Sequence, residues 1–327
     1  MLCTISCPIR ADDALDTALQ DAINQTNPFD VQTLLEKGAN VNVGVGSDQS
    51  LLMQVAAYNA MKPQTPAPPN YEGLLRHPFL KSSSPMPPTT AHLLIMEILI
   101  NAGADIESRD DLGRTALWWA VCDGNNQSVE LLLQHGANTE AVDELLGRTA
   151  LMFAVMDLEE DGKSTLLLEH GAKVNASDRS GETVLMLAAG HPVSANVALL
   201  LKHGAEVNAR SPHGSSALME AARRGCTDNA RLLLEHGGEV NAQAVDGITA
   251  LMYAAGAGDH YIYKYDKKRR TYLQVYQKEL VGTKDLVALL LSKGAKVNLR
   301  DRHHFTALHY ANDPAIIRLL KQHGARE

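Results

Sequence analysis

Histidine recurs in the same local context at several places in the sequence. An imidazole there could transfer a proton or hold a metal ion. His135, His170, His203, His236 and His323 each directly precede a glycine. Each also ends a leucine-rich segment with helical spacing, where an imidazole commonly binds the free carbonyl groups of the last turn. We therefore expect these histidines to close helices rather than to catalyse a reaction.

Two smaller groups contain residue types that bind metals. Asp301 stands close to His303 and His304, but both histidines fall in a turn, and His304 takes the place that glycine holds in other turns. Cys3 and Cys7 could form a metal or redox pair, or could be two thiols in a loose N-terminus. The sequence contains no glycine-rich phosphate loop, no Cys-x-x-Cys pair and no serine nucleophile motif. We expect no catalytic residues, no cofactor and no metal.

Tyrosine and basic residues concentrate between residues 259 and 282. Tyrosine and arginine often carry the binding energy of protein interfaces, because they combine large contact area with directional hydrogen bonds. The residues that we expect to contact a partner here are Tyr261, Tyr263, Tyr265, Arg269, Arg270, Tyr272 and Tyr276. The alternative is that these tyrosines pack on their own part of the chain and that the basic residues form a solvated turn.

The same segment has the pattern of a β-hairpin. Tyrosine alternates with other residues over 261–265, and residues 272–276 form a second β-prone run after the charged stretch 266–270. A helix over 272–281 is the alternative.

The elements that must position these residues repeat along the chain. The motif Gly-Ala-x-Val-Asn, or a close variant, begins at Gly38, Gly103, Gly136, Gly171, Gly204, Gly237 and Gly294. The central copies are 33 or 35 residues apart. A fixed period of this size is typical of proteins built from stacked repeats.

One copy shows what each repeat should form. Ser216 stands where a helix N-cap belongs, and residues 217–222 are a strong helix-forming run. Gly225 ends that helix, residues 229–236 form a second, and Gly237 suits the left-handed conformation that closes it. Neither helix is long enough to be stable alone in water, so neighbouring copies must stack.

This pattern resembles the ankyrin repeat, a turn followed by two antiparallel helices. The resemblance is carried by Gly113-Arg-Thr-Ala-Leu117, Gly147-Arg-Thr-Ala-Leu151, Gly181-Glu-Thr-Val-Leu185, Gly247-Ile-Thr-Ala-Leu251 and Thr306-Ala-Leu-His309. The family usually has Thr-Pro-Leu-His here; this chain has Ala or Val in place of Pro, and only His309 keeps the His. The resemblance implies an all-α solenoid that binds other proteins through its turn tips and the concave side formed by its first helices.

We expect about eight helix-turn-helix repeats with two insertions, after an N-terminal segment 1–10. The expected repeats are 11–42, 43–107, 108–140, 141–175, 176–208, 209–241, 242–298 and 299–327, together one domain over 11–327. The first insertion, 61–90, holds eight of the thirteen prolines and favours an extended loop, or alternatively a ligand for an SH3-like domain. The second is the tyrosine-rich segment 259–282.

Composition restricts the partners and the compartment. The net charge of −8 and the pI of about 5.9 make nucleic acid and anionic membranes improbable as general partners. Four cysteines in 327 residues are no disulfide framework, and no apolar run is long enough for a signal peptide or a membrane span. We expect a cytoplasmic protein, or one delivered to another cell, that is monomeric when unbound.

Information in a repetitive stack lies at exposed positions that vary between copies. At the turn tips these are Arg109, Arg114, Arg148, Arg179, Arg210, His213, Arg300 and Arg302. On the first helices they are Asp123, Asp157, His191, Arg223 and Arg224, and Trp119 and Phe153 on the same helices are expected to be partly packed and partly exposed. The arginines either pair with acids of adjacent tips or form a surface for a partner with acidic or mixed-charge patches.

These features predict a non-catalytic protein-interaction module, in its narrower form an inhibitor or immunity-type protein that plugs an enzyme or toxin. Two other classes stay open. One is binding of nucleic acid or another anion through the basic tyrosine-rich insertion. The other is an enzyme with its site in the insertions, which contain few residues suited to catalysis.

Overall fold

The computed structural model describes residues 11–45, 49–57, 88–157, 162–257, 261–266, 271–276 and 284–326. The chain divides into two compact units, Met1–Leu145 and Leu146–Glu327. The division falls inside the expected repeat 141–175. The proline-rich segment 61–87, Arg269, Arg270 and the N-terminal segment 1–10 lie outside the described residues.

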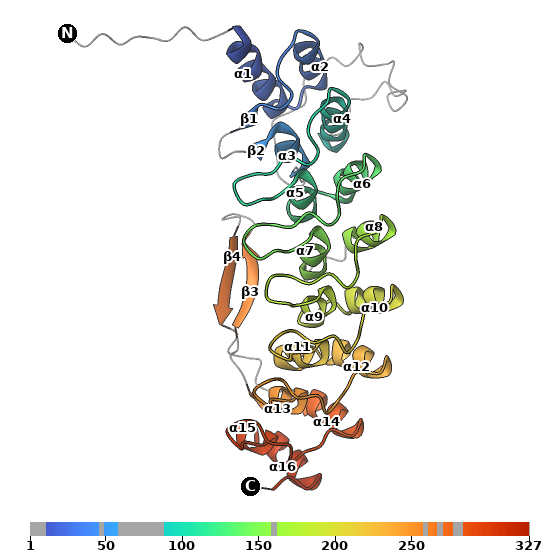
Figure 1. Ribbon diagram of the computed structural model, residues 1–327, viewed down its shortest axis with the longest axis vertical. Helices are drawn as coiled ribbons and strands as arrows, with labels where there is room; N and C mark the ends of the chain where they lie inside the picture. Colours follow the sequence, from blue (N-terminus) through green and yellow to red (C-terminus); the bar gives the residue numbers. More distant parts are fainter. Residues whose placement is uncertain are drawn as a thin grey trace, which may run out of the picture. The chain divides into compact units, whose positions relative to one another are not determined.

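The first unit contains six helices and one short antiparallel ribbon among its described residues (Figure 1). They are α1 (Ala11–Asn24), α2 (Pro28–Glu36), β1 (Gly44–Val45), β2 (Gln49–Ser50), α3 (Leu51–Ala56), α4 (Pro88–Asn101), α5 (Ala116–Cys122) and α6 (Asn126–Gln134). In α1 the apolar residues Leu19, Ala22 and Ile23 lie at helical spacing and are buried.

The second unit continues the alternation of short helices. Its described elements are α7 (Ala150–Met156), α8 (Lys163–Glu169), α9 (Val184–Ala189), α10 (Ser194–Lys202), α11 (Ala217–Arg224), α12 (Thr227–Glu235), α13 (Ala250–Ala255), β3 (Tyr261–Asp266), β4 (Thr271–Tyr276), α14 (Lys284–Ser292), α15 (Ala307–Tyr310) and α16 (Pro314–Gln322). The fold is therefore helical, as the sequence predicts. The number of repeats stays a prediction.

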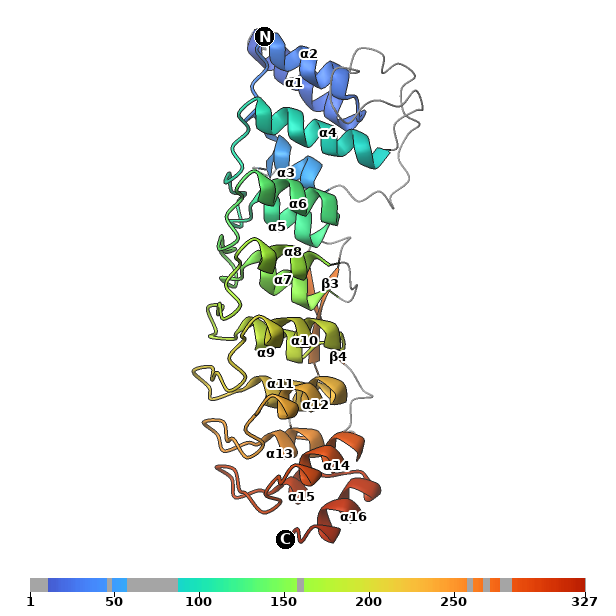
Figure 2. The same ribbon diagram turned by 90° about the vertical axis from the view of Figure 1, so that its right-hand side faces the viewer.

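Helices of the second unit form two rows. The first helices α7, α9, α11, α13 and α15 each contact the next first helix, and each packs on the second helix of its own repeat (Figure 1). The second helices α10, α12, α14 and α16 also contact one another in order. The loops that end at the first helices, which we call the tips, all project on one side of this unit (Figure 2). Exposed positions of neighbouring repeats thus lie in register along the stack.

The repeated threonine or serine explains where each first helix begins. The side-chain oxygens of Thr115, Thr183, Ser216 and Thr249 each accept a hydrogen bond from the backbone N–H three residues later, which is N-capping. The following alanine and leucine residues are almost fully buried, as Ala217 and Leu218 show. The predicted N-cap at Ser216 is confirmed.

The repeated asparagine joins consecutive repeats. The Asn208 side chain donates to the Gly237 carbonyl at 3.0 Å and accepts from the Glu239 N–H at 2.9 Å. Asn241 and Asn298 make the same pair of bonds to the copies that follow them. The asparagine of the Gly-Ala-x-Val-Asn motif is therefore an inter-repeat link, a role that the sequence alone did not reveal.

The structure describes a part of each insertion. The expected loop 61–90 ends earlier than predicted, because α4 already begins at Pro88; proline is well tolerated in a first helical turn. The predicted hairpin is confirmed over its described strands, which pair antiparallel with Tyr261 opposite Tyr276 and Tyr265 opposite Tyr272. Tyr263 lies opposite Gln274. The five tyrosine positions therefore all belong to the same set of alternating positions on the two paired strands.

Candidate partner-binding site

Several tip arginines serve the tips themselves. Arg210 donates from Nη1 to the carbonyl oxygens of Gly214, in its own tip, and Gln243, in the next one. Arg109 makes the equivalent contacts with Gly113 and Val142, and Arg300 donates to the His304 carbonyl. These arginines are exposed but already bonded, so the alternative of a structural role accounts for much of what they do.

The tip of repeat 108–140 closes over a buried ion pair. The Asp110 carboxylate accepts from Arg114 Nε at 2.7 Å and from the indole N–H of Trp119 at 3.1 Å. Its other oxygen accepts the backbone N–H groups of Leu112 and Arg114. The Arg114 guanidinium also lies over the rings of Trp118 and Trp119, at 4.8 and 4.3 Å. This cluster fixes the tip on the first helix.

Four of the predicted contact residues are largely buried, so the expected exposure of Arg114 and Asp123 is wrong and Trp119 and Phe153 serve mainly in packing; their contact with a partner stays a prediction. Arg114, Trp119, Asp123 and Phe153 are only 9%, 1%, 8% and 5% exposed. Arg114 is held inside by Asp110, and Trp119 and Phe153 lie on the packed sides of α5 and α7. Position in the repeat identified their helices correctly but not the direction in which each side chain packs.

A different set of charged residues gathers at and just before the first helices of the second unit: Glu220, Arg223 and Arg224 lie on α11, whereas Arg148 and Glu182 directly precede the N-caps of α7 and α9. Arg148 donates from Nε to Asp178 at 3.0 Å and lies 3.5 Å from Glu182. Glu220, one turn into α11, binds Arg223 on the same helix, with the Arg223 Nε at 3.0 Å. Arg224 follows. We call Arg148, Glu182, Glu220, Arg223 and Arg224 the first-helix cluster.

Mutual electrostatic effects show that the members of this cluster are close enough to interact. Burial, with the neighbouring Glu220 and Asp178 carboxylates, raises the pKa of Glu182 above its usual value, against the attraction of Arg148 and Arg223. Burial and repulsion from Arg223 lower the pKa of Arg224 to about 10. Burial alone would lower the pKa of Arg223, but attraction and hydrogen bonding to Glu220 raise it above its usual value. The cluster is a partly desolvated network of mixed charge.

His191 lies beside this cluster and gives the second unit a pH dependence. Burial, then repulsion from Arg224 and Arg148, lowers the pKa of His191 from 6.5 to about 4, although Asp157 works in the opposite direction. Unfolding therefore takes up a proton between these two values, and stability is lost as the pH falls through that window. By linkage, acidification from pH 7 to pH 5 should cost about 2 kcal/mol through this group.

Replacing His191 with glutamine should remove most of that loss. We expect the urea midpoint of the wild type to fall more steeply than that of the variant between neutral pH and about pH 5. The raised pKa of Glu182 acts oppositely, because protonation of that carboxyl favours the folded state, and it is common to both proteins. Equal pH slopes for the two proteins would contradict the assignment.

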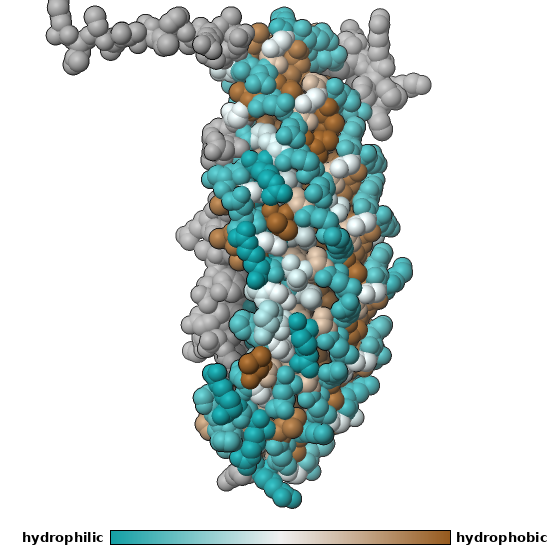
Figure 3. Space-filling model, in the orientation of Figure 1, coloured by the Kyte–Doolittle hydropathy of each residue, from teal (hydrophilic) through white to brown (hydrophobic). Residues whose placement is uncertain are grey.

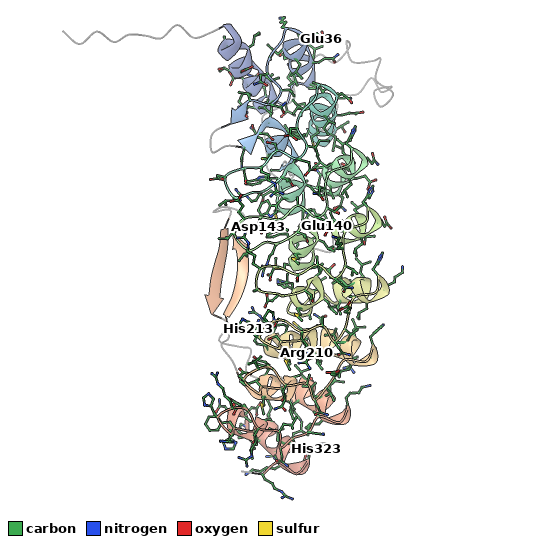
Figure 4. All side chains as sticks on the ribbon, in the orientation of Figure 1. Glu36, Glu140, Asp143, Arg210, His213 and His323 are labelled. Carbon is green, nitrogen blue, oxygen red and sulfur yellow. The ribbon has the colours of Figure 1, made fainter. Side chains whose placement is uncertain are left out.

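The remaining predicted residues separate into three groups. Arg148, Asp157, His191, Arg223 and Arg224 are half-buried on or beside the first helices, and the structure brings them together. Arg109, Arg179, Arg210, His213, Arg300 and Arg302 are exposed along the tips, where Figure 4 shows Arg210 and His213. The side chains of Tyr261, Tyr263, Tyr265, Arg269, Arg270, Tyr272 and Tyr276 lie outside the described residues.

Sequence reasoning missed Glu220 and the tip aspartates. Glu220 is the one charged residue in the apolar run 217–222, and that interruption was the available signal. Asp110, Asp178 and Asp301 each accept two backbone N–H groups of their own tip through one oxygen. The second oxygen of Asp110 binds Trp119 and Arg114, that of Asp178 binds Arg148, and that of Asp301 binds Tyr310.

The histidines that precede glycine close helices, as predicted. His135, His170, His203, His236 and His323 are the C-cap residues of α6, α8, α10, α12 and α16. The ring Nδ1 atoms of His236 and His323 lie 2.9 Å from the carbonyl oxygens of Leu232 and Leu319 (Figure 4 shows His323). Within the described residues, no three His, Cys, Asp or Glu side chains are grouped to hold a metal ion.

Comparison with known proteins identifies the repeat. The family model for ankyrin repeats matches three overlapping spans, residues 90–178, 144–211 and 159–244. The crystal structure of the ankyrin repeat domain of Bcl-3 superposes with a TM-score of 0.54 and 27% identity, over 71% of this chain and 93% of that one. This chain is an ankyrin-repeat protein. The resemblance seen in the sequence is thereby confirmed, and ankyrin repeats generally mediate protein–protein interaction.

The curated relatives contain ankyrin repeats within longer proteins. The mouse B-cell lymphoma 3 protein homolog is 40% identical over 96 residues, which cover 29% of this chain and 21% of that protein. Mouse ankyrin repeat and SOCS box protein 6 is 38% identical over 92 residues, covering 28% and 22%. The chain thus matches about a fifth of the length of these relatives. Among the described residues, no helix has the length and apolar character needed to cross a bilayer.

Proposed function

We propose that this ankyrin-repeat protein is a non-catalytic interaction module whose second unit binds a partner protein over the first-helix cluster. The observation that carries this proposal is the first-helix cluster itself: Glu220 pairs with Arg223 on α11, Glu182 lies 3.5 Å from Arg148, and these groups and Arg224 shift one another's pKa values. Half-buried charges cost desolvation energy, and their mutual pairing offsets only part of it.

Such a network suits recognition better than stability. Fixed charges of both signs select a complementary surface and reject others, because a mismatched charge would be desolvated without a partner. Figure 3, which looks onto the tips, shows single apolar residues among polar ones over the tips of the second unit, with further apolar atoms toward its second helices. These features support a partner with mixed-charge patches rather than one bound through a broad apolar area.

The β3–β4 hairpin is the second contact that we propose. Its support is the sequence and the register: five tyrosine positions stand in line on two paired strands, and tyrosine concentrates interface energy. A regular repeat passes directly from its first to its second helix and needs no such ribbon. An inhibitor-type role, in which occupation itself blocks the partner's own site, is the narrower form of this proposal.

Capture of the native partner tests both contacts. The full chain, immobilised through its C-terminus, is incubated with native lysate, and co-purified proteins are quantified by mass spectrometry. We expect Arg224→Gln with Tyr253→Ala, or Tyr263→Ala with Tyr265→Ala, to reduce recovery of a stoichiometric partner at least about tenfold, since hot-spot truncations cost this much or more. Arg224 lies on α11; Tyr253, on the neighbouring α13, interacts electrostatically with Glu220 and Arg223 of the cluster, and both residues are half-buried.

Arg231→Gln is the matched control, because Arg231 is exposed on α12 in the second-helix row. It should recover the partner as the wild type does, and all variants should keep the wild-type circular dichroism spectrum. Recovery unaffected by either double variant would reject these surfaces. Loss of the captured material on nuclease treatment, with a steep salt dependence, would favour nucleic-acid binding instead.

A further inference from the structure

The tip of the last repeat carries an exposed group of rings and cations. Phe305 is 44% exposed and stacks on His309, with ring centroids 5.2 Å apart and planes inclined by 16°. His303 lies 6.2 Å from Phe305 on another side, and Arg302 Nε donates to His303 Nε2 at 3.1 Å. We call Arg302, His303, His304, Phe305 and His309 the terminal patch.

Hydrogen bonds behind the patch hold it in place. One Asp301 oxygen accepts the N–H groups of His303 and Phe305, at 2.8 and 2.9 Å, and the other accepts the Tyr310 hydroxyl. Burial together with the bond to Asp301 raises the pKa of Tyr310 to about 12, so this hydroxyl keeps its proton. His309 Nδ1 accepts the Thr306 N–H at 3.2 Å. The rings are therefore preorganised before any partner arrives, which reduces the entropy lost on binding.

His304 is the unusual residue of this tip. It adopts φ = 62°, in the left-handed region, where the equivalent positions of the other tips are Gly113, Gly147, Gly181, Gly214 and Gly247. A side chain in this conformation is strained, and such strain commonly occurs at functional positions. In exchange, the exposed tip gains an imidazole that glycine would not supply.

The charge of the patch indicates the chemistry of its partner. Arg300, Arg302 and the exposed imidazoles of His303 and His304 supply cations and N–H donors, whereas the one carboxylate within the tip, Asp301, is buried and bonded on both oxygens. The neighbouring carboxylate of Asp246 accepts the Ile248 N–H in its own tip. A carboxylate ligand would meet donors here, and Phe305 would cover an adjacent apolar side chain.

We propose that the terminal patch docks an acidic segment of a partner protein, with Asp or Glu side chains on Arg302 and the imidazoles and an apolar residue on Phe305. This inference rests on the proposed function as an interaction module, and it names a contact separate from the first-helix cluster. Arginine suits the task because its planar guanidinium can bind a carboxylate through two parallel hydrogen bonds.

Peptide selection with the purified full chain tests the docking without knowledge of the partner. A random dodecapeptide library displayed on phage is selected on the wild type and counter-selected on Arg302→Gln and on Phe305→Ala. The clones that depend on both residues should contain Asp or Glu beside an apolar residue. A representative synthetic peptide should bind each variant at least about tenfold more weakly by fluorescence anisotropy, as should its Glu→Gln form to the wild type.

Arg318→Gln provides the matched control, because Arg318 is exposed on α16 outside the patch, and it should bind as the wild type does. Failure to enrich clones that depend on Arg302 and Phe305, or enrichment of clones without acidic residues, would overturn the proposal. A fluorescent single-stranded oligonucleotide that bound through the same two residues would overturn it in favour of a nucleic acid. Since the selection omits the native partner, either result leaves the test of the first-helix cluster independent.

Discussion

Replacing Asp110 with asparagine is expected to destabilise the first unit by about 3–5 kcal/mol, because the change leaves the buried Arg114 guanidinium without its counter-charge. Whichever way the new amide is oriented, its NH₂ group faces donors: Arg114 Nε and the Trp119 indole on one side, two backbone N–H groups on the other. Those donors are buried and would lose their acceptor.

Tryptophan fluorescence can measure this effect locally. The sequence has two tryptophans, Trp118 and Trp119, and both contact the Arg114 guanidinium. Urea titration should therefore show an earlier fluorescence transition in Asp110→Asn. Asp246→Asn is the matched control, because the Asp246 carboxylate accepts the Ile248 N–H at 3.1 Å in a half-buried tip. It should change the tryptophan transition little, and equal effects of both substitutions would refute the role given to Asp110.

Gly247→Ala is expected to lower the free energy of unfolding of the last repeat by about 3 kcal/mol, through two effects that add. The residue has φ = 82°, which costs an L-amino acid about 1–2 kcal/mol. A Cβ atom there would also lie 2.8 Å from Asp301 Cα and 3.2 Å from Arg302 N, both backbone atoms that cannot yield easily. The collision falls where the Arg302 N–H donates to the Asp246 carbonyl, a link between the two tips.

Gly237→Ala separates the two effects. Gly237 has nearly the same conformation, φ = 87°, but a Cβ atom there meets nothing within 4 Å. It should show the conformational cost alone, about 1 kcal/mol. Hydrogen exchange of α15 and α16, followed by mass spectrometry, should accelerate clearly more in Gly247→Ala than in Gly237→Ala. The same acceleration in both would mean that tip-to-tip contact contributes little.

Local signals in the sequence were sufficient for the secondary structure. A cap at Ser216, a left-handed Gly237 and a hairpin with alternating tyrosines all follow from residue preferences within a few positions. Such features are decided by backbone geometry and by hydrogen bonds between near neighbours in the chain. The period of the motif then indicated stacking, which the two rows of helices confirm.

The candidate site was less predictable, because side-chain burial depends on residues from neighbouring repeats. Arg114 looked like an exposed tip arginine until Asp110 and two indole rings were seen around it. Glu220 looked like an ordinary helix former, yet it lies 8% exposed against Arg223 and affects Glu182 from the adjacent repeat. Composition at a repeat position cannot distinguish an arginine that faces solvent from one that holds a tip together.

The histidine at position 304, where other tips have glycine, also bears on how the number of repeats in such a protein can change during evolution. At all five glycine tips, the space that a Cβ atom would occupy is taken by the tip that follows, with the nearest atoms 2.3–2.9 Å away. His304 fills that space with its own side chain. A repeat packed against this tip in the regular geometry would meet the His304 side chain, so we expect such a repeat to need either glycine at position 304 or a shift of the neighbouring tip.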